Sequence, residues 1–91
     1  MADRIVITVL GTDQTGMVAA VSAKASSLNM NIIDIAQKVF EDNIFTMIML
    51  VKNIGEKDIK SLQDEFQALE DEIGVRIFLQ HEEIFRTMHR I

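Results

Sequence analysis

The sequence predicts a single α+β domain of the ferredoxin-like class, in which two helices cover one face of a four-stranded antiparallel sheet. The first observation behind this prediction is the order of local patterns along the 91 residues, which reads strand, helix, strand, strand, helix, strand. The second is that right-handed crossovers convert this βαββαβ order into such a sandwich. We expect one domain over residues 1–91, with its core in residues 4–80 and a short C-terminal helix in residues 82–90.

The first strand is expected over residues 4–10, where β-branched residues fill a run too short to indicate a helix. Apolar residues then recur at helical spacing and predict a helix that begins at about Gly16. These residues are Val18, Val21, Ala25 and Leu28. The helix is expected to end at Asn29, because asparagine tolerates the left-handed conformation that often follows a helix end.

Two further strands are expected to follow this helix. The first of them covers residues 32–39, and alternation places Ile33, Ile35 and Val39 on one face. The next covers residues 44–51 and is apolar on both faces, whereas a strand covered on one side only would alternate with polar residues. We therefore expect both faces of this strand to be covered.

The remaining elements are a helix, a strand and the C-terminal tail. Residues 59–73 combine one apolar stripe with an acidic back, and Gly74 is a plausible C-cap. The last strand is expected over residues 75–80. The tail helix over residues 82–90 is too short to be stable alone, so it must dock on the bare sheet face or on a partner subunit. Its apolar residues are Ile84, Phe85 and Met88.

Composition excludes several classes of function. The chain has no cysteine, so disulfides, thiolate nucleophiles and cysteine metal sites are absent. A net charge of -5 argues against direct binding of nucleic acid, which depends on Lys and Arg neutralising phosphates. No apolar run reaches the roughly 18 residues of a membrane span, so we expect a cytoplasmic protein that does not enter the membrane. Phe45 and Phe78 are interpreted as core residues rather than as a platform for RNA bases.

Nothing in the sequence indicates catalysis. The two histidines, His81 and His89, are eight residues apart and do not match the helical pairing of a zinc site. Neither has a nucleophile motif around it. Adjacent carboxylates such as those of residues 82 and 83 point in different directions on a helix and suit solvation. The sequence therefore predicts a protein that is not an enzyme and has no catalytic residue, metal or cofactor.

The segment from Leu10 to Met17 is the strongest candidate for a binding loop. Gly11 and Gly16 allow tight bends, and a helix that begins near Gly16 would present unpaired amides at the positive end of its dipole. Such a site favours a carboxylate or phosphate. A triphosphate loop is excluded because no Lys-Ser or Lys-Thr follows Gly16. The alternative is a capped strand-to-helix turn that binds nothing.

Two stretches carry a resemblance to a known family. Residues 7–22 read Ile-Thr-Val-Leu-Gly-Thr-Asp-Gln-Thr-Gly-Met-Val-Ala-Ala-Val-Ser, and residues 28–35 read Leu-Asn-Met-Asn-Ile-Ile-Asp-Ile. They resemble the ACT domain, a small regulatory module of amino-acid metabolism, and above all the stand-alone single-ACT proteins of the UPF0237 type. The loop also resembles those of the glycine-cleavage-system transcriptional repressor and formyltetrahydrofolate deformylase. The resemblance extends over essentially the whole chain.

The resemblance implies a homodimer or higher homo-oligomer that binds a small amino acid at the subunit interface. The ligand would lie between the loop after the first strand and the segment that leads into the second strand of a neighbour. By position, the loop candidates are Asp13, Gln14, Thr15, Gly16 and Met17. The candidates before and within the second strand are Asn29, Asn31 and Ile32.

The chemistry of these residues agrees with an amino-acid ligand. The amides of Gly16 and Met17 can take its carboxylate, Asp13 can meet its ammonium group, and Asn31 can bridge either. Met30 or Ile32 can line the pocket for its side chain. Two alternatives stay open: Asn31 can simply belong to a turn that ends the helix, and the whole chain can be a ligand-free interaction module that docks on a metabolic enzyme or regulator.

Overall fold

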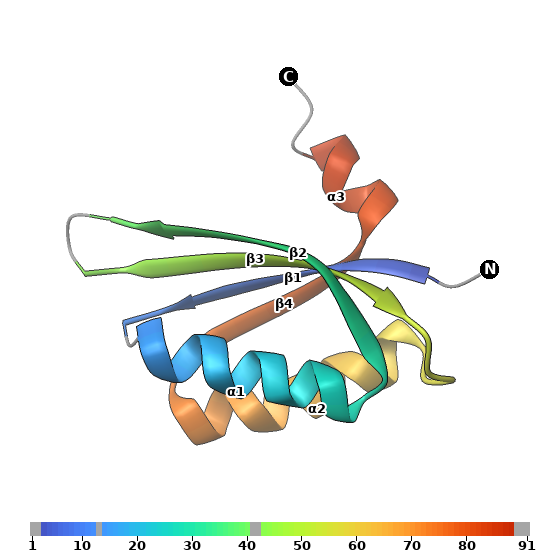
Figure 1. The fold of residues 1–91 in the computed structure, drawn as a ribbon, viewed down its shortest axis with the longest axis horizontal. Coiled ribbons are helices and arrows are strands. Elements are labelled where there is room, and N and C mark those ends of the chain that lie inside the picture. Colours follow the sequence, from blue (N-terminus) through green and yellow to red (C-terminus); the bar gives the residue numbers. More distant parts are fainter. Residues whose placement is uncertain (1–2, 13, 41–42, 89–91) are drawn as a thin grey trace.

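The computed structural model describes residues 3–12, 14–40 and 43–88 and confirms the predicted ferredoxin-like class (Figure 1). Helices lie between the strands in the expected order, and a short helix ends the described chain. The elements are β1 (Asp3–Gly11), α1 (Gln14–Ser27), β2 (Met30–Val39), β3 (Phe45–Asn53), α2 (Ile59–Ile73), β4 (Arg76–His81) and α3 (Glu82–Met88).

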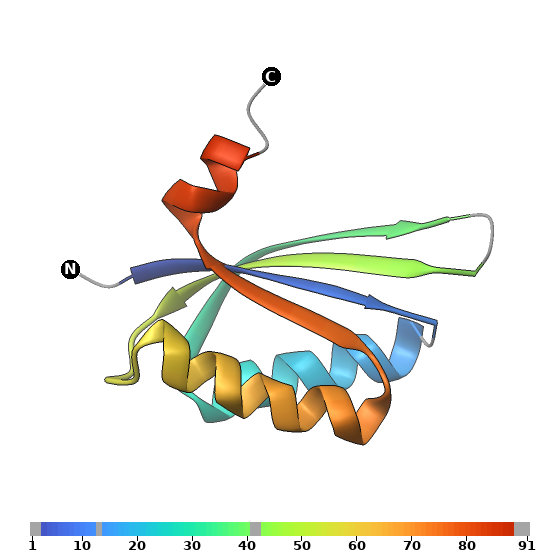
Figure 2. The ribbon, with the colours of Figure 1, turned by 180° about the vertical axis from the view of Figure 1, so that it is seen from behind.

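The four strands form one antiparallel sheet in the order β2-β3-β1-β4. At one end of the sheet Gly11 and Val39 both pair with Phe45, and we call this the loop end. At the opposite end Asp3 and Met30 both pair with Asn53. Helices α1 and α2 cover one face, while α3 stands on the other side, as the front and back views show (Figures 1 and 2).

The core lies between the sheet and these two helices. Alternate residues of β1 and β3 are fully buried, and α2 contributes the apolar stripe that its sequence predicts. Burying each such side chain contributes about 1.5–3 kcal/mol before entropy is counted. The largest are Phe45, Phe66, Ile5, Ile7, Met17, Met47 and Met49. Phe45 is thus a core residue, as predicted.

Local capping explains the boundaries of α2, which match the prediction. The Asp58 carboxylate accepts a hydrogen bond of 2.9 Å from the Ser61 amide, and this bond lowers the pKa of Asp58. Gly74 has φ 70°, a left-handed conformation that closes the last turn. A hydrogen bond from Lys24 of α1 holds the pKa of Glu65 below its usual range and ties the two helices together.

Strand β2 corrects one expectation from the sequence. Ile32 pairs with Val51 and Asp34 pairs with Leu50, so a β-bulge leaves Ile33 as an extra residue. The bulge resets the alternation. Ile32 and Ile35 therefore pack on the core, whereas Ile33 is 46% exposed. The prediction that Ile33 shares a face with Ile35 was wrong because alternation cannot anticipate a bulge.

The sheet surface away from α1 and α2, which we call the open face, corrects a second expectation. Phe78 is 45% exposed there, because it alternates with the buried Ile77 and Leu79. Its assignment to the core was wrong. Ile48 of β3 is half-buried on the same surface, where only α3 adds cover among the described residues. Within one chain the predicted cover on both faces of β3 is therefore incomplete.

Side chains of α2 occupy the outer edge of β4. The Ile77 amide donates to Glu70 Oε2 at 2.6 Å, and the Leu79 amide donates to Gln63 Oε1 at 3.1 Å. Gln63 Nε2 also donates to the Ile77 carbonyl oxygen at 3.3 Å. These bonds use backbone groups that a further strand would need, so they close this edge of the sheet.

Replacing Glu70 with Ala should lower the free energy of unfolding by about 1–2 kcal/mol, because the Ile77 amide loses a charged acceptor. Glu70→Gln keeps an acceptor oxygen and should recover part of the loss. Urea denaturation followed by circular dichroism measures both changes. Glu72→Ala, at an exposed position of the same helix, is the matched control, and an equal loss in that variant would contradict this account.

Candidate functional site

The loop after β1 leads directly into α1. Helix α1 begins at Gln14, two residues before the predicted start, so Gly16 is its third residue and Met17 its fourth. The fourth residue of a helix ordinarily donates its amide within the helix, so the Met17 amide is not available to an anion. Gly16 is exposed at this end of α1. The candidate Asp13 lies outside the described residues, and the side chains of Gln14 and Thr15 are not described either.

Packing beneath the loop fixes its position. The Met17 side chain is 1% exposed and belongs to the core, so it anchors the first turn of α1 rather than lining a pocket. Gly11 makes this packing possible. A Cβ atom at residue 11 would lie 2.6 Å from Met17 Sδ and 2.7 Å from Val75 Cγ1, which is too close for ordinary contact. Residue 11 must therefore be glycine for the backbone at the end of β1 to lie this close to the side chains of Met17 and Val75.

The second group of candidates lies where α1 turns into β2. Asn29 has φ 59°, which confirms the left-handed helix end predicted for it. Its carbonyl oxygen accepts a hydrogen bond of 3.0 Å from the Ile54 amide, which holds the turn against the loop after β3. Asn31 is exposed, whereas Ile32 is half-buried against the core.

Two shallow pockets open beside this turn. The smaller, about 240 Å³, is lined by Asn29 and Asn31 together with Ser26, Met30 and Ile54. The larger, about 570 Å³, shares Asn29 and Ile54 and extends over the loop of residues 55–57. Gly55 lets this loop approach, since a Cβ there would lie 2.9 Å from the Leu28 carbonyl oxygen. Asn29 and Asn31 therefore share one pocket, and Ile32 does not line it.

The two groups of candidates are not brought together within one chain. Gly16 lies at the start of α1 and Asn29 lies just after its end. A helix of 14 residues is about 21 Å long. None of the pockets described above is lined by Gly16 or Met17. A ligand that touches both groups must therefore lie between two chains.

Sequence reasoning missed the contribution of the loop after β3. Ile54 and Gly55 line the larger pocket, but they follow Asn29 by 25 residues or more in the sequence. Gly55 was a possible signal, because a glycine in a loop often permits close backbone approach. Only the antiparallel pairing of β2 with β3 puts this loop beside the end of α1.

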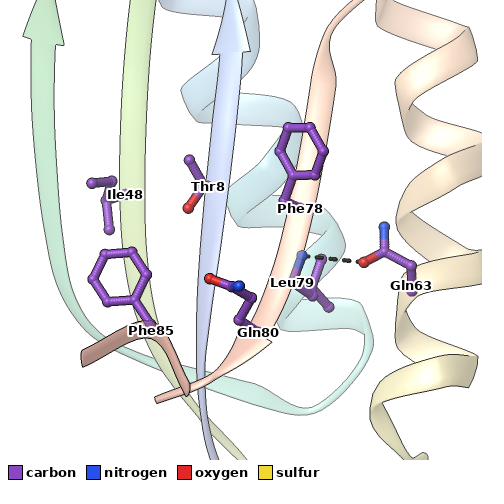
Figure 3. Close-up of a pocket in the computed structure, with 7 residues that line it drawn as sticks. All are labelled: Thr8, Ile48, Gln63, Phe78, Leu79, Gln80 and Phe85. Atoms are coloured by element: carbon purple, nitrogen blue, oxygen red, sulfur yellow. Dashed lines mark hydrogen bonds between the residues drawn. The ribbon is translucent and has the colours of Figure 1, made fainter. Parts of the chain in front are cut away.

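A third pocket, of about 400 Å³, lies on and around β4 (Figure 3). The Phe78 ring extends from β4, and Phe85 of α3 lies toward Ile48 of β3 (Figure 3). Gln63, whose Oε1 accepts a hydrogen bond from the Leu79 amide, also lines this pocket (Figure 3). The full lining is Thr8, Ile48, Gln63, Phe78, Leu79, Gln80 and Phe85. This mixture of apolar and amide groups suits contact with another surface.

The described residues offer little for metal chemistry. They contain no group of three or more acidic, histidine or cysteine side chains placed to hold an ion. His81 is half-buried at the end of β4, and His89 lies outside the described residues. None of the helices in the described ranges has the length and apolar character needed to cross a membrane.

Comparison with known proteins gives concordant matches. A family model described as the ACT domain matches residues 3–80. A UPF0237 protein from Methanocaldococcus jannaschii is 45% identical over 89 residues, an alignment that covers 97% of this chain and 98% of that protein. The structure of an ACT domain protein from Streptococcus pneumoniae superposes with a TM-score of 0.83 at 39% identity, covering 93% of this chain and 96% of the other.

A more distant structure shares the fold alone. A putative glycine cleavage system transcriptional repressor superposes with a TM-score of 0.78 at 18% identity. The match covers 88% of this chain and 46% of that one. The repressor is thus about twice as long as the part that resembles this chain.

Replacing Gly11 with Ala should lower the free energy of unfolding by about 1–3 kcal/mol, because the added methyl group must displace Met17 or Val75. Thermal denaturation is the measurement. Gly16→Ala is the control, since alanine at an exposed helical position should not reduce stability. If both variants unfolded at the wild-type temperature, the packing described for the loop would be incorrect.

Proposed function

Since the chain belongs to the ACT domain family, we propose that it is a regulatory domain without enzymatic activity that binds a small amino acid at a homodimer interface. ACT domains are regulatory domains that bind small ligands. The observation that carries the finer proposal is the placement of the two candidate groups at opposite ends of α1. One chain cannot join them, but a two-fold dimer can.

The edges of the sheet support β2 as the strand that pairs. Side chains from α2 occupy the β4 edge, whereas no described element lies beside β2 (Figures 1 and 2). On β2 the Asp34 carboxylate accepts from the amide of the next residue, Ile35, at 2.9 Å. This hydrogen bond is local, so a backbone carbonyl oxygen of an incoming strand can replace the Asp34 carboxylate as the acceptor for the Ile35 amide. An edge of this kind is a natural template for another chain.

Antiparallel pairing of two β2 strands would unite the two half-sites. A two-fold axis reverses the strand direction, so the Met30 end of one strand lies beside the Val39 end of the other. Val39 lies at the loop end of the sheet, together with Gly11. The start of α1 in one copy would therefore face the pocket of Asn29 and Asn31 in its partner.

The chemistry of such a shared site suits a free amino acid. The start of α1 carries the positive end of the helix dipole and favours the carboxylate. The side-chain amides of Asn29 and Asn31 can accept from the ammonium group. The side chain of Met30 is 5% exposed and supplies an apolar wall to the pocket. Asp13, Gln14, Thr15 and Ile32 remain part of the proposed site by their position.

A ligand-free interaction module is the second candidate function. Exposed apolar side chains favour this second candidate. Phe78 on the open face is 45% exposed, and Ile84 on α3 is 51% exposed. Exposed apolar groups that cluster on one surface commonly mark contacts with other proteins. The two candidates differ in whether any amino acid stabilises the fold.

When the unfolding temperature is measured with each of the twenty amino acids in turn, the amino acid that binds should raise it and the others should not. A ligand at about 100 times its dissociation constant adds about 2.7 kcal/mol, which shifts a domain of this size by several degrees. Asn31→Ala should abolish the shift, and Gln67→Ala, exposed on α2, should retain it. A flat response across the panel at fixed protein concentration would favour the ligand-free module instead.

A mixing experiment tests whether the site is shared between chains. Asn31→Ala and Gly16→Val should each abolish binding as homodimers. A heterodimer of the two variants contains one intact site, because its wild-type Gly16 and wild-type Asn31 come from different chains. Unfolding and refolding the mixture should therefore restore about a quarter of the wild-type sites in calorimetry. If mixing restores no binding, the two residues do not meet across an interface.

A further inference from the structure

We propose that Val39 forms the floor between the two half-sites of the shared site, and that it selects an amino acid with an aliphatic side chain. This assignment rests on the proposed function, because Val39 of one copy reaches the pocket of the other only when two β2 strands pair. It adds a residue to the proposed site and names the class of its ligand.

Val39 is exposed although it lies on the side of the sheet that the helices cover. It pairs with Phe45, which pairs in turn with Gly11 at the loop end. Residues directly opposite each other on paired strands point to the same side, and Phe45 is a core residue at 1% exposure. Val39 is nevertheless 58% exposed, so α1 and α2 leave it uncovered within one chain. An apolar side chain at this position is available to contact a ligand.

The register of the sheet determines which residue lies opposite Val39 in the proposed dimer. Val39 and Met30 pair with the first and last residues of β3, and Ile35 pairs with its middle residue, Met49. A two-fold axis through Ile35 therefore sets Met30 of each copy opposite Val39 of the other and pairs β2 over its whole length. Any other position of the axis leaves one end of β2 unpaired.

The β-bulge and the backbone of β2 both suit this register. Met30 and Val39 are nine residues apart and would face opposite sides of a regular strand, but the extra residue Ile33 brings both to the helix side. The axis also places the two Ile35 residues opposite each other. Each Ile35 amide, which donates to Asp34 within one chain, can then donate to the Ile35 carbonyl oxygen of the other copy.

Val39 then lies between the two half-sites. Across the joined sheet, one row runs from Met30 of one copy through Val39 and Phe45 to Gly11 of the other. This row spans about 14 Å at the usual strand spacing. The pocket lined by Met30 and Asn31 lies at one end of the row, and α1 begins three residues after Gly11 at the other. An amino acid that lies on Val39 therefore has the helix start on one side and the asparagine amides on the other.

The described groups around this position are apolar or uncharged. The 240 Å³ pocket has no charged side chain in its described lining, and Ile54 in that lining is 62% exposed. Met30 adds a wall and Val39 of the other copy adds the floor. A charged ligand side chain would lose water here without gaining a partner, which is unfavourable. Each methylene of an aliphatic side chain is worth about 10- to 200-fold in affinity in such a site.

Substitution of Val39 should change which amino acid binds. In calorimetry the wild type should bind valine, leucine, isoleucine or methionine and should not bind glycine, aspartate or lysine. Val39→Ala should weaken this binding by about tenfold or more. Val39→Phe should weaken binding of the larger of these amino acids most, because the ring fills the floor. Ile44→Ala is the control, since Ile44 is 42% exposed beside the same end of the sheet but lies outside β2.

Mixing experiments test which chain supplies Val39. Val39→Glu puts a charge on the floor and should abolish binding as a homodimer. Its heterodimer with Asn31→Ala keeps one site with both residues intact, so refolding the mixture should restore about a quarter of the wild-type sites. Its heterodimer with Gly16→Val keeps no intact site, because Gly16 and Val39 of each site come from the same chain. Sedimentation equilibrium verifies pairing, and Val39→Phe replaces Val39→Glu in the mixtures if the charge prevents it.

The possible outcomes separate the role of Val39 from the proposed function. Selective binding of a charged amino acid, or unchanged affinities in the Val39 variants, would overturn that role and leave the shared site standing. Rescue by Gly16→Val instead of Asn31→Ala would overturn it too. If none of the twenty amino acids binds, the proposed function fails and the role of Val39 fails with it.

Discussion

The two-residue period of the central strands constrains everything else in this structure. β1 and β3 lie at the centre of the sheet, and alternate side chains such as Ile7 and Met49 are fully buried beneath the helices. The intervening residues must then point the other way. Because Ile48 and Leu50 of β3 hold two of these positions, the burial of one face leaves apolar side chains on the other. The fold therefore satisfies its core and at the same time creates a surface suited to association.

The length of α1 imposes a second constraint. The helix crosses the sheet from the loop end to the opposite end, so the residues at its two termini cannot meet in one chain. Gly11 and Met17 fix its start by close packing, and the Asn29 turn fixes its end through the Ile54 amide. Both proposed half-sites therefore lie on packed elements. The proposed site would depend on association, and association would then couple ligand binding to assembly.

The two edges of the sheet differ in how they are protected. On β4 the protection comes from Gln63 and Glu70, which reach from α2 to outward backbone groups. On β2 it comes from Asp34, a residue of the strand itself. A contact with a packed helix is harder to displace than a local one, because displacement would also disturb the core beside it. This asymmetry is why we propose β2, and not β4, as the edge for pairing.

The sequence by itself determined the order of elements, the bounds of α2 and the left-handed end of α1 at Asn29. All of these follow from interactions between near neighbours, which periodicity and capping residues record. Tertiary structure alone decided the bulge at Ile33 and the exposure of Phe78, since both depend on which strand lies alongside and which face the helices cover. Tertiary structure also decided that Ile54 lines the same pocket as Asn29 and donates its amide to the Asn29 carbonyl oxygen. Strand pairing brings these residues together, and no local pattern connects them.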